Sequence, residues 1–445
     1  MKKSEYVIYE TSPARGVTEA YPLGNGILGA LLYGDCADTK FVFTHQDISD
    51  GKEGNGNFDI PFDGEYIEIS GIKEYLSHCQ KRNLKNIGEL RIKIAGEASE
   101  YKRSLDLRRS VAEWEFSIDD NRVRTECFLS SPANLLILEM KSEKRIDAEI
   151  SLDMFSANEI YAYGMQVTYL SGAREENCGK SYAAAVRINT DGALTRDGKT
   201  ACVTGATLTR VVVTVEPGED VKTCEAAILK RISSAIGKGY NTLKEEHISD
   251  VSRIFDRVEL TFLSPDFFDL STSKRLKAFP YGAKDYALTA LLFNMGRYLY
   301  TAAYRENSRC ENLYGLWNIY AAPSEIDLPE INPSEWTPDL AMEYIRSVMT
   351  IVTESTEYGI FPNMMFALER YGCVGNLAFS AALYEMLINE KGGRPAALPS
   401  LPCEFATGSV KGIKIESGRM ADVSWCDGRV VEFKVYLSDN KKVNN

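Results

Sequence analysis

Residues 111–129 read VAEWEFSIDDNRVRTECFL and contain two strand-like runs, 111–118 and 123–129, on either side of a short polar segment. Apolar and polar residues alternate in these runs, which is typical of half-buried strands. The polar segment, Asp119-Asp120-Asn121, supplies the residue types that tight turns favour. This stretch therefore predicts an antiparallel hairpin.

The same alternation recurs from Tyr6 to about Val215, punctuated by turn residues such as Asp191-Gly192 and Pro217-Gly218. Many short strands without helical periodicity between them are typical of a large antiparallel sandwich. We therefore predict an N-terminal β-sandwich domain over residues 1–222. Its further strands are expected at 40–43, 89–94, 135–140, 183–188 and 208–215.

The pattern becomes helical after Pro217. Apolar residues recur at three- and four-residue intervals in 224–236 and 238–257, which predicts a helical linker over residues 223–284 that also holds a strand near 258–262. Residues 285–304 are apolar on most sides, as in a helix buried within a bundle. With helical patterns at 339–354 and 377–389, they predict a helical domain over residues 285–394.

The last segment alternates again. Residues 409–415, 420–424 and 429–436 read as three strands joined by Ser417-Gly418 and Asp427-Gly428. They predict a small C-terminal β domain over residues 395–445. The expected fold class is therefore α+β and multidomain.

Composition limits the classes of function. Apolar residues make up 44% and charged residues 26%, and the net charge of −12 argues against nucleic-acid or anionic-membrane partners. No apolar run approaches the ~18 residues of a membrane span, and Met1 to Thr11 lack the apolar segment of a secretory signal. The ten cysteines include no C-x-x-C pair, which favours free thiols. We expect a cytoplasmic protein.

Gly24-Asn25-Gly26-Ile27-Leu28-Gly29 matches the G-x-G-x-x-G pattern of dinucleotide sites. That pattern binds a pyrophosphate when a strand leads into it and a helix leads out. Here the turn-rich segment 13–22 precedes it and a strand-like run follows, so we expect no nucleotide and no other cofactor. His45, His78 and His247 fall far apart, which favours packing roles over a metal site or a catalytic triad.

The run Pro22-Leu23-Gly24-Asn25-Gly26-Ile27-Leu28-Gly29-Ala30, followed by Tyr33-Gly34 and residues 40–50, resembles the N-terminal β-sandwich of glycoside hydrolase family 95. Later segments resemble the same family in the same order, so the resemblance covers nearly the whole chain. These segments are 88–90, 101–107, 238–258, 296–299, 312–318, 398–402 and 408–412.

The resemblance implies a β-sandwich, a helical linker, a barrel of the (α/α)6 type and a small C-terminal β-sandwich. Members of that family are inverting α-L-fucosidases or related galactosidases. In them a Glu of the barrel is the general acid. Two Asn residues in an N-x-N motif, helped by an Asp, position the attacking water.

Carried over by position, the N-x-N motif falls on Glu330-Ile331-Asn332, so Asn332 keeps the second Asn and Glu330 replaces the first. Residues 363–376 follow the family's N-L-F-D-A-H…D-G-N-F-G segment, with Leu368 in place of its His and Val374 in place of its Asp. The resemblance therefore implies Glu330 and Asn332 as catalytic residues. It implies substrate-binding roles for Trp317, Asn318, Trp336 and Asn376.

The barrel is expected to be shortened. At ~11–12 residues for a helix and ~2–8 for a loop, residues 286–389 hold about six or seven helices and not twelve. The jump against the family pattern lies between about Trp336 and Ala341, and no Glu here matches the family's general acid.

Two hypotheses of function remain. The first is a family 95-like glycoside hydrolase acting on α-L-fucosides or related glycosides, with weak or lost activity. The alternative is a catalytically inactive remnant that serves as a carbohydrate-binding or oligomeric scaffold, in which Trp317, Trp336 and Tyr314 either stack on a sugar or pack between helices. The expected partner is a fucosylated or galactosylated glycan. A homo-oligomer could cover the apolar helices that a shortened barrel exposes.

Overall fold

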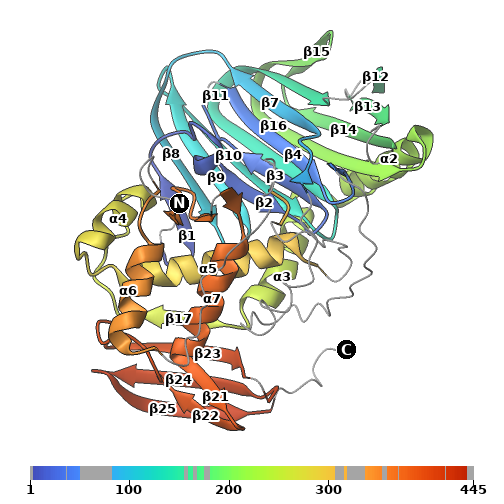
Figure 1. The fold of residues 1–445 in the computed structure, drawn as a ribbon. Coiled ribbons are helices and arrows are strands. Elements are labelled where there is room, and N and C mark those ends of the chain that lie inside the picture. The colour runs from blue at the N-terminus through green and yellow to red at the C-terminus, as the bar shows by residue number, and fades with distance from the viewer. Residues whose placement is uncertain are drawn as a thin grey trace.

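The structure is a computed structural model of the chain. It describes residues 4–36, 38–50, 83–154, 159–163, 168–174, 181–305, 315–317, 336–352, 358–368, 370–415 and 417–437. A large antiparallel sheet lies on one side of a helical layer, and a small antiparallel sheet lies on the other (Figure 1). The termini of the described chain lie near the helical layer and the small sheet (Figure 1).

The large sheet follows the order β1-β8-β9-β10-β11-β16-β14-β13-β12, with a branch β2-β3-β4-β7 that joins at β11 and with β15 paired to β16. Its strands are β1 (Val7–Glu10), β2 (Tyr21–Gly24), β3 (Leu28–Leu32), β4 (Asp38–His45), β7 (Gly88–Ile94), β8 (Ala98–Asp106), β9 (Val111–Ile118), β10 (Asn121–Ser130), β11 (Leu135–Met154), β12 (Glu159–Tyr163), β13 (Thr168–Arg174), β14 (Ser181–Thr190), β15 (Ala193–Asp197) and β16 (Thr200–Gly218). The predicted antiparallel N-terminal β structure is confirmed.

The hairpin predicted from residues 111–129 is β9–β10. Asn121 pairs directly with Ile118, so the loop consists of Asp119 and Asp120 alone. Both loop residues have positive φ, 48° and 56°, which is the conformation of the two-residue turns that match strand twist. Buried side chains of β9, among them Trp114 and Phe116, enter the main core.

Strand β11 joins the two parts of the large sheet. Its first half pairs with β10 and β16, and residues from Ala148 to Met154 pair with β7. The register with β16 shifts between Lys141 and Ala148, so the strand bends where its polar run is exposed. This bend lets one long strand serve both the main path and the branch.

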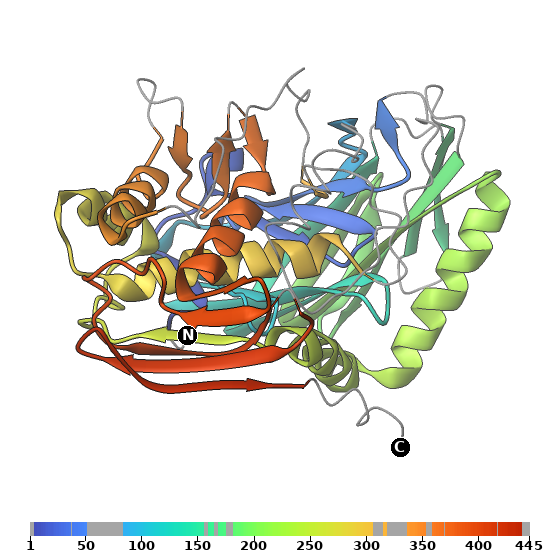
Figure 2. The ribbon, with the colours of Figure 1, turned by 60° about the horizontal axis from the view of Figure 1, so that its bottom comes forward.

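Two helices follow the large sheet, as the sequence predicts: α2 (Val221–Lys238) and α3 (Tyr240–Phe255). Cys224, Ile228 and Ile232 of α2 pack on Ala183 and Ala185 of β14. Figure 2 shows α2 lying along this side of the large sheet. The sequence pattern therefore identified the helices and the apolar face each one buries.

The helical layer contains α4 (Thr272–Ala278), α5 (Tyr286–Ala303), α6 (Pro338–Val348) and α7 (Val374–Leu387). Every residue of α5 except Tyr286 and Tyr300 is buried, and every residue of α7 except Glu385 is buried. These two helices therefore leave no apolar face open. The oligomer itself stays a prediction, as does the barrel-type arrangement of helices.

The small sheet has the order β17-β23-β24-β25, with β17 (Glu259–Phe262), β23 (Gly408–Lys414), β24 (Met420–Cys426) and β25 (Arg429–Tyr436). The three C-terminal strands are confirmed, and β17, which follows the helical linker, completes their sheet. Shorter elements are β5 (Ser49–Asp50), β6 (Asn83–Leu84), β18 (Tyr358–Ile360), β19 (Phe366–Leu368), β20 (Arg370–Gly372), β21 (Ile388–Lys391), β22 (Arg394–Ala397) and the 3-10 turns η1 (Val17–Glu19) and η2 (Phe279–Tyr281). None of the described helices is long and apolar enough to cross a membrane.

Candidate functional site

Asn376 lies in the first turn of α7 and is fully buried. Its Nδ2 donates to the carbonyl oxygen of Met364 at 2.7 Å, and its Oδ1 accepts from the backbone N–H of Phe366 at 2.9 Å. Both ends of the amide are thus bonded to the backbone of the preceding segment. In this structure Asn376 holds a loop in place, and because it is fully buried its amide does not meet the surface where a sugar or a water would bind.

The loop that Asn376 holds is tied to the β-sandwich by a second amide. Asn363 Nδ2 donates to the carbonyl of Ala20 at 2.7 Å and to that of Val17 at 3.3 Å, while Asn363 Oδ1 accepts from Met365 N–H at 3.1 Å. Met364, between them, has a φ of 67°, a conformation that costs energy for a residue with a side chain. Two side-chain amides therefore fix a strained turn.

Close packing explains the glycine beside Asn376. A Cβ on Gly375 would lie 2.2 Å from Phe366 Cδ1, so the ring of Phe366 occupies the space a side chain would need. A Cβ on Gly296 of α5 would lie 2.5 Å from the carbonyl oxygen of Asn376 and 2.1 Å from Ser380 Oγ. Helices α5 and α7 thus pack closely against each other at Gly296, beside Asn376.

The positions expected to support catalysis are apolar. Val374 is the first residue of α7 and is 4% exposed, and Leu368 is the last residue of β19. A valine at this place can neither orient a side-chain amide nor take up a proton. Within the described residues, no group of three or more His, Cys, Asp or Glu side chains is arranged to hold a metal ion.

A general acid needs a raised pKa. Among the described carboxyl groups, burial raises the pKa of Glu10 and of Asp106. Glu10 Oε1 accepts from the N–H and hydroxyl of Ser273 at 2.8 and 2.6 Å, at the start of α4. Asp106 accepts from the N–H of Arg109 at 3.0 Å. Each carboxyl thus organises local structure, far in the chain from the segments that resemble the catalytic motif.

Trp317 belongs to the core. It is 1% exposed, and its Nε1 donates to the carbonyl of Leu23 at 2.8 Å. Gly24 leaves room for the indole, since a Cβ there would lie 2.9 Å from its ring. Gly315, two residues before the tryptophan, has a φ of +72°, which favours glycine. Trp317 therefore joins the helical layer to β2 and offers no exposed face to a ligand.

Trp336 retains an exposed part. It is half-buried and its ring lies 4.8 Å from that of Tyr344, which in turn stacks on Phe379 at 6.1 Å. Burial raises the pKa of the Tyr344 phenol above its usual range. Three rings thus run from the surface beside α6 into α7. Glu330, Asn332 and Asn318, as well as Tyr314, lie outside the described residues, and their roles stay predictions.

The glycine-rich run 24–29 is the turn between β2 and β3, so a strand leads out of it where a dinucleotide site needs a helix. Asn25 Oδ1 accepts from the N–H groups of Ile27 and Leu28 at 3.1 and 2.8 Å. The N–H of Gly26 donates to the carbonyl of Ala302 at 2.8 Å, at the end of α5. This turn therefore docks the sandwich onto the end of α5. Sequence analysis did not identify that role.

Two of the three histidines also have packing roles. His247 Nε2 lies 3.1 Å from the carbonyl oxygen of Ser110, and its ring stacks on Phe128 at 4.7 Å. Burial lowers the pKa of His247 to about 4. His45 is 1% exposed, and its Nδ1 accepts from Asp47 N–H at 3.1 Å. His78 lies outside the described residues.

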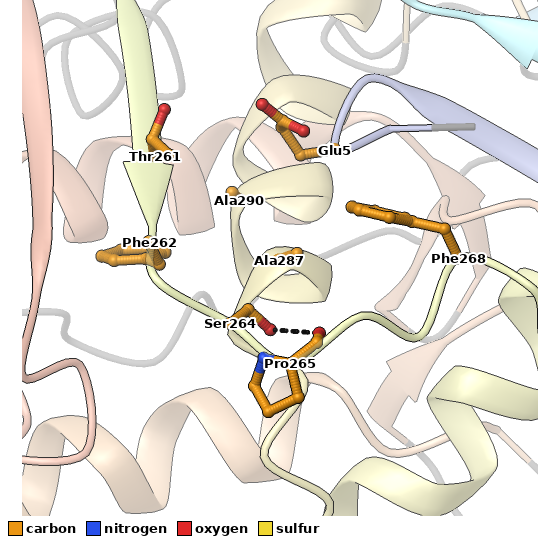
Figure 3. Close-up of a pocket in the computed structure, with 8 residues that line it drawn as sticks. All are labelled: Glu5, Thr261, Phe262, Ser264, Pro265, Phe268, Ala287 and Ala290. Carbon is orange, nitrogen blue, oxygen red and sulfur yellow. Dashed lines mark hydrogen bonds between the residues drawn. The ribbon is translucent and has the colours of Figure 1, made fainter. Parts of the chain in front are cut away.

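A cavity of about 120 Å³ lies apart from Asn376, near the start of α5 (Figure 3). Ala287 and Ala290 of α5 form its back wall in this view. The other lining residues come from the N-terminal segment, from β17 and from the loop after it: Glu5, Thr261, Phe262, Ser264, Pro265 and Phe268. Sequence analysis gave no signal for it, because its wall combines segments distant in the chain.

Comparison with protein families gives two matches. A family model described as "Glycosyl hydrolase family 95 catalytic domain" matches residues 239–324, and one described as "Glycosyl hydrolase family 65, N-terminal domain" matches residues 59–220. The first match covers the end of the helical linker and the beginning of the helical layer. The second covers most of the large sheet.

Among curated proteins, "Alpha-L-fucosidase 2" of Arabidopsis thaliana is 23% identical over 78% of this chain and 47% of its own length. "Probable alpha-fucosidase A" of Aspergillus niger is 25% identical over 69% of this chain and 44% of its own length. The chain thus spans about half the length of the curated relatives it matches.

Among solved structures, a "Putative kojibiose phosphorylase from human microbiome" is 11% identical with a TM-score of 0.46, and it covers 68% of this chain and 42% of its own. A bacterial glucoamylase complexed with acarbose is 10% identical with a TM-score of 0.28, over 67% of this chain and 44% of its own.

Proposed function

Since this chain is a relative of glycoside hydrolase family 95, we propose that it acts on α-L-fucosides or related glycosides, with a hydrolytic rate that is weak or lost. The named relatives are α-fucosidases, and they supply the class of substrate. The proposed partner is accordingly a fucosylated or galactosylated glycan.

One observation carries the proposal of a weak or lost rate: the amide of Asn376 is fully buried and bonded at both ends to the backbone of Met364 and Phe366, next to the buried Val374. Hydrolysis of a glycosidic bond with inversion needs a proton donor and a group that activates water on opposite sides of the sugar. Loss of one acid–base group typically costs about 10²–10⁴-fold in rate. The described residues around Asn376 supply neither group.

Glu330 and Asn332 remain as the pair that could sustain a residual rate. Glu330 stands at the position of a water-positioning amide, and a carboxylate there can act as a general base. This assignment rests on the sequence pattern and on the resemblance.

The test is hydrolysis of an aryl α-L-fucoside and an aryl α-L-galactoside by the purified chain. We expect slow turnover, which disappears in Glu330→Gln and persists in the control Glu143→Gln, an exposed carboxylate on β11. Turnover that survives in Glu330→Gln would contradict the role of this residue. Rapid turnover would contradict the weak rate itself.

The partly exposed ring of Trp336, which lies tilted against that of Tyr344, favours a second candidate, a catalytically inactive carbohydrate-binding scaffold. An aromatic face of this kind suits the apolar side of a sugar ring. It predicts saturable binding of L-fucose or D-galactose without turnover, with a change in tryptophan fluorescence that is lost in Trp336→Leu. Binding that is unchanged in Trp336→Leu would remove the support for this candidate.

A further inference from the structure

The cavity at the start of α5 contains a carboxylate, that of Glu5, that has no partner among the described residues. Among the described residues, the side chain of Glu5 makes no hydrogen bond and no ion pair, whereas its backbone carbonyl accepts from Asn294 Nδ2 at 3.5 Å. In Figure 3 this carboxylate points across one end of the cavity toward the hydroxyl of Thr261. One end of the cavity is therefore polar and negatively charged.

The rest of the cavity is apolar or already satisfied. Ala287 and Ala290 are one helical turn apart on α5, so their small side chains leave the space open on one face of the helix. Phe268 closes the opposite side (Figure 3). Ser264 Oγ donates to the carbonyl oxygens of Pro265 and Lys284 at 3.1 and 3.4 Å, so this hydroxyl is engaged within the loop.

Three arginines near this region have partners of their own. Arg275 donates to both oxygens of Asp285 at 2.7 and 2.9 Å, and its guanidinium lies 5.2 Å from the centre of the Phe268 ring. Arg108 pairs with Asp256 at 2.6 Å. Arg297 donates to the carbonyls of Val258 and Phe255 at 3.0 and 2.6 Å. None of these three guanidinium groups pairs with the Glu5 carboxylate within the described part of the chain.

We propose that this cavity binds a short-chain primary ammonium ion, with the ammonium on the Glu5 carboxylate and the Thr261 hydroxyl and the carbon chain against Ala287 and the Phe268 ring. A carboxylate forms a charge-assisted hydrogen bond with an ammonium donor. The cavity lining contains none of the residues predicted to contact a sugar, so the proposal goes beyond the proposed function.

Size limits the ligand. An apolar cavity of about 150 Å³ accommodates a molecule such as benzene, so the cavity here, at about 120 Å³, holds about five heavy atoms. A monosaccharide is too large for this space. Butylammonium fits, and because a ligand of this size has few contacts, we expect a dissociation constant in the millimolar range.

The experiment is a titration of the full chain with butylammonium, followed by NMR or calorimetry, beside butan-1-ol and butyrate as neutral and anionic probes of the same length. We expect saturable one-to-one binding of butylammonium, and at least about tenfold weaker binding of the other two. Equal binding of butan-1-ol would overturn the proposal, because the charge would then contribute nothing. No binding of butylammonium to the folded chain would overturn it as well.

Three variants locate the site. Glu5→Gln should weaken butylammonium binding at least about tenfold, as expected for a lost charge-assisted hydrogen bond. Ala287→Val should block the apolar end. Glu259→Gln, which removes an exposed carboxylate from β17 outside the cavity lining, is the matched control and should bind as the parent does. Unchanged binding in Glu5→Gln, in a chain with the parent's melting temperature, would overturn the proposal.

Discussion

Two regions along helix α5 differ in how their surroundings use polar groups. Around Gly296, near the middle of the helix, the amides of Asn376 and Asn363 and the hydroxyl of Ser380 are all bonded to backbone atoms within the fold. At the Ala287 end, the Glu5 carboxylate faces a cavity without a described partner. Binding and catalysis need polar groups that the fold leaves available. The region around Gly296 and Asn376, which resembles a catalytic motif, therefore has its polar groups engaged, and we call it the closed region. The region at the start of α5, with the cavity, carries no motif, and we call it the open region.

The largest loss of stability should come from a substitution at Gly296, in the closed region, where α5 meets α7. In Gly296→Val, the new side chain would collide with the backbone of Asn376 and with Ser380 Oγ, at 2.5 and 2.1 Å from a Cβ. Both helices are buried, so little relaxation is available, and we expect a loss of about 4 kcal/mol or more in the free energy of unfolding. Denaturant titration measures it. A loss below about 1 kcal/mol would show that α5 and α7 can separate.

The next largest loss of stability should come from removing the side-chain amide of Asn376 in the closed region. Asn376→Ala leaves the N–H of Phe366 and the carbonyl of Met364 buried without this partner, which should cost about 2–4 kcal/mol. Ser380→Ala, which removes one hydroxyl from the same helix, should cost about 1 kcal/mol. Chemical denaturation of both variants checks the difference. Equal losses would mean that the Asn376 amide is replaceable.

Acid should destabilise the packing of helix α3, which carries the buried His247. The pKa of His247 is about 4 in the folded chain, against ~6.5 in an unfolded one. The unfolded state therefore binds the proton more readily, and stability is complete above pH 6.5 and falls as the pH drops toward 4. The shift corresponds to about 3 kcal/mol at most. Unfolding at several pH values should show this slope, and His247→Gln should lack it.

The smallest change in stability should come from a substitution of Glu5 in the open region. Glu5→Gln breaks no described hydrogen bond of the side chain. The free energy of unfolding should therefore change by no more than about 0.5 kcal/mol, as for other surface substitutions, and the melting temperature should stay close to that of the parent. Differential scanning calorimetry checks this expectation. A clear loss of stability would show that the carboxylate has a structural role. The two regions of α5 would then not differ in how the fold uses their polar groups.

Local patterns predicted much of the fold. The alternation and the acidic turn of residues 111–129 identified the β9–β10 hairpin, and the apolar periodicity of residues 285–304 identified α5. Prediction fell short where the local pattern ended before the element did. Residues 135–140 were predicted as a strand, but β11 continues to Met154 through a polar run, because pairing with β16 and β7 extends it.

The candidate site was less predictable, for a physical reason. The sequence shows that Val374 and Leu368 stand where the resemblance implies proton-handling residues, and it shows Asn376 as a retained amide. Whether an amide is free or engaged depends on which backbone atoms surround it. Its bonds to Met364 and Phe366 therefore became visible in the fold alone.

By itself, the sequence determined the antiparallel sandwich, the helices and the residues that differ from the motif of the family it resembles, since each of these follows from local periodicity or from residue identity. Tertiary structure alone decided that Trp317 is core, that the turn at residues 24–29 docks on α5, and that Glu5 faces a cavity built with β17 and α5. Those facts depend on contacts between segments far apart in the chain. Such contacts form when side chains fill a shared space, and no local pattern encodes them.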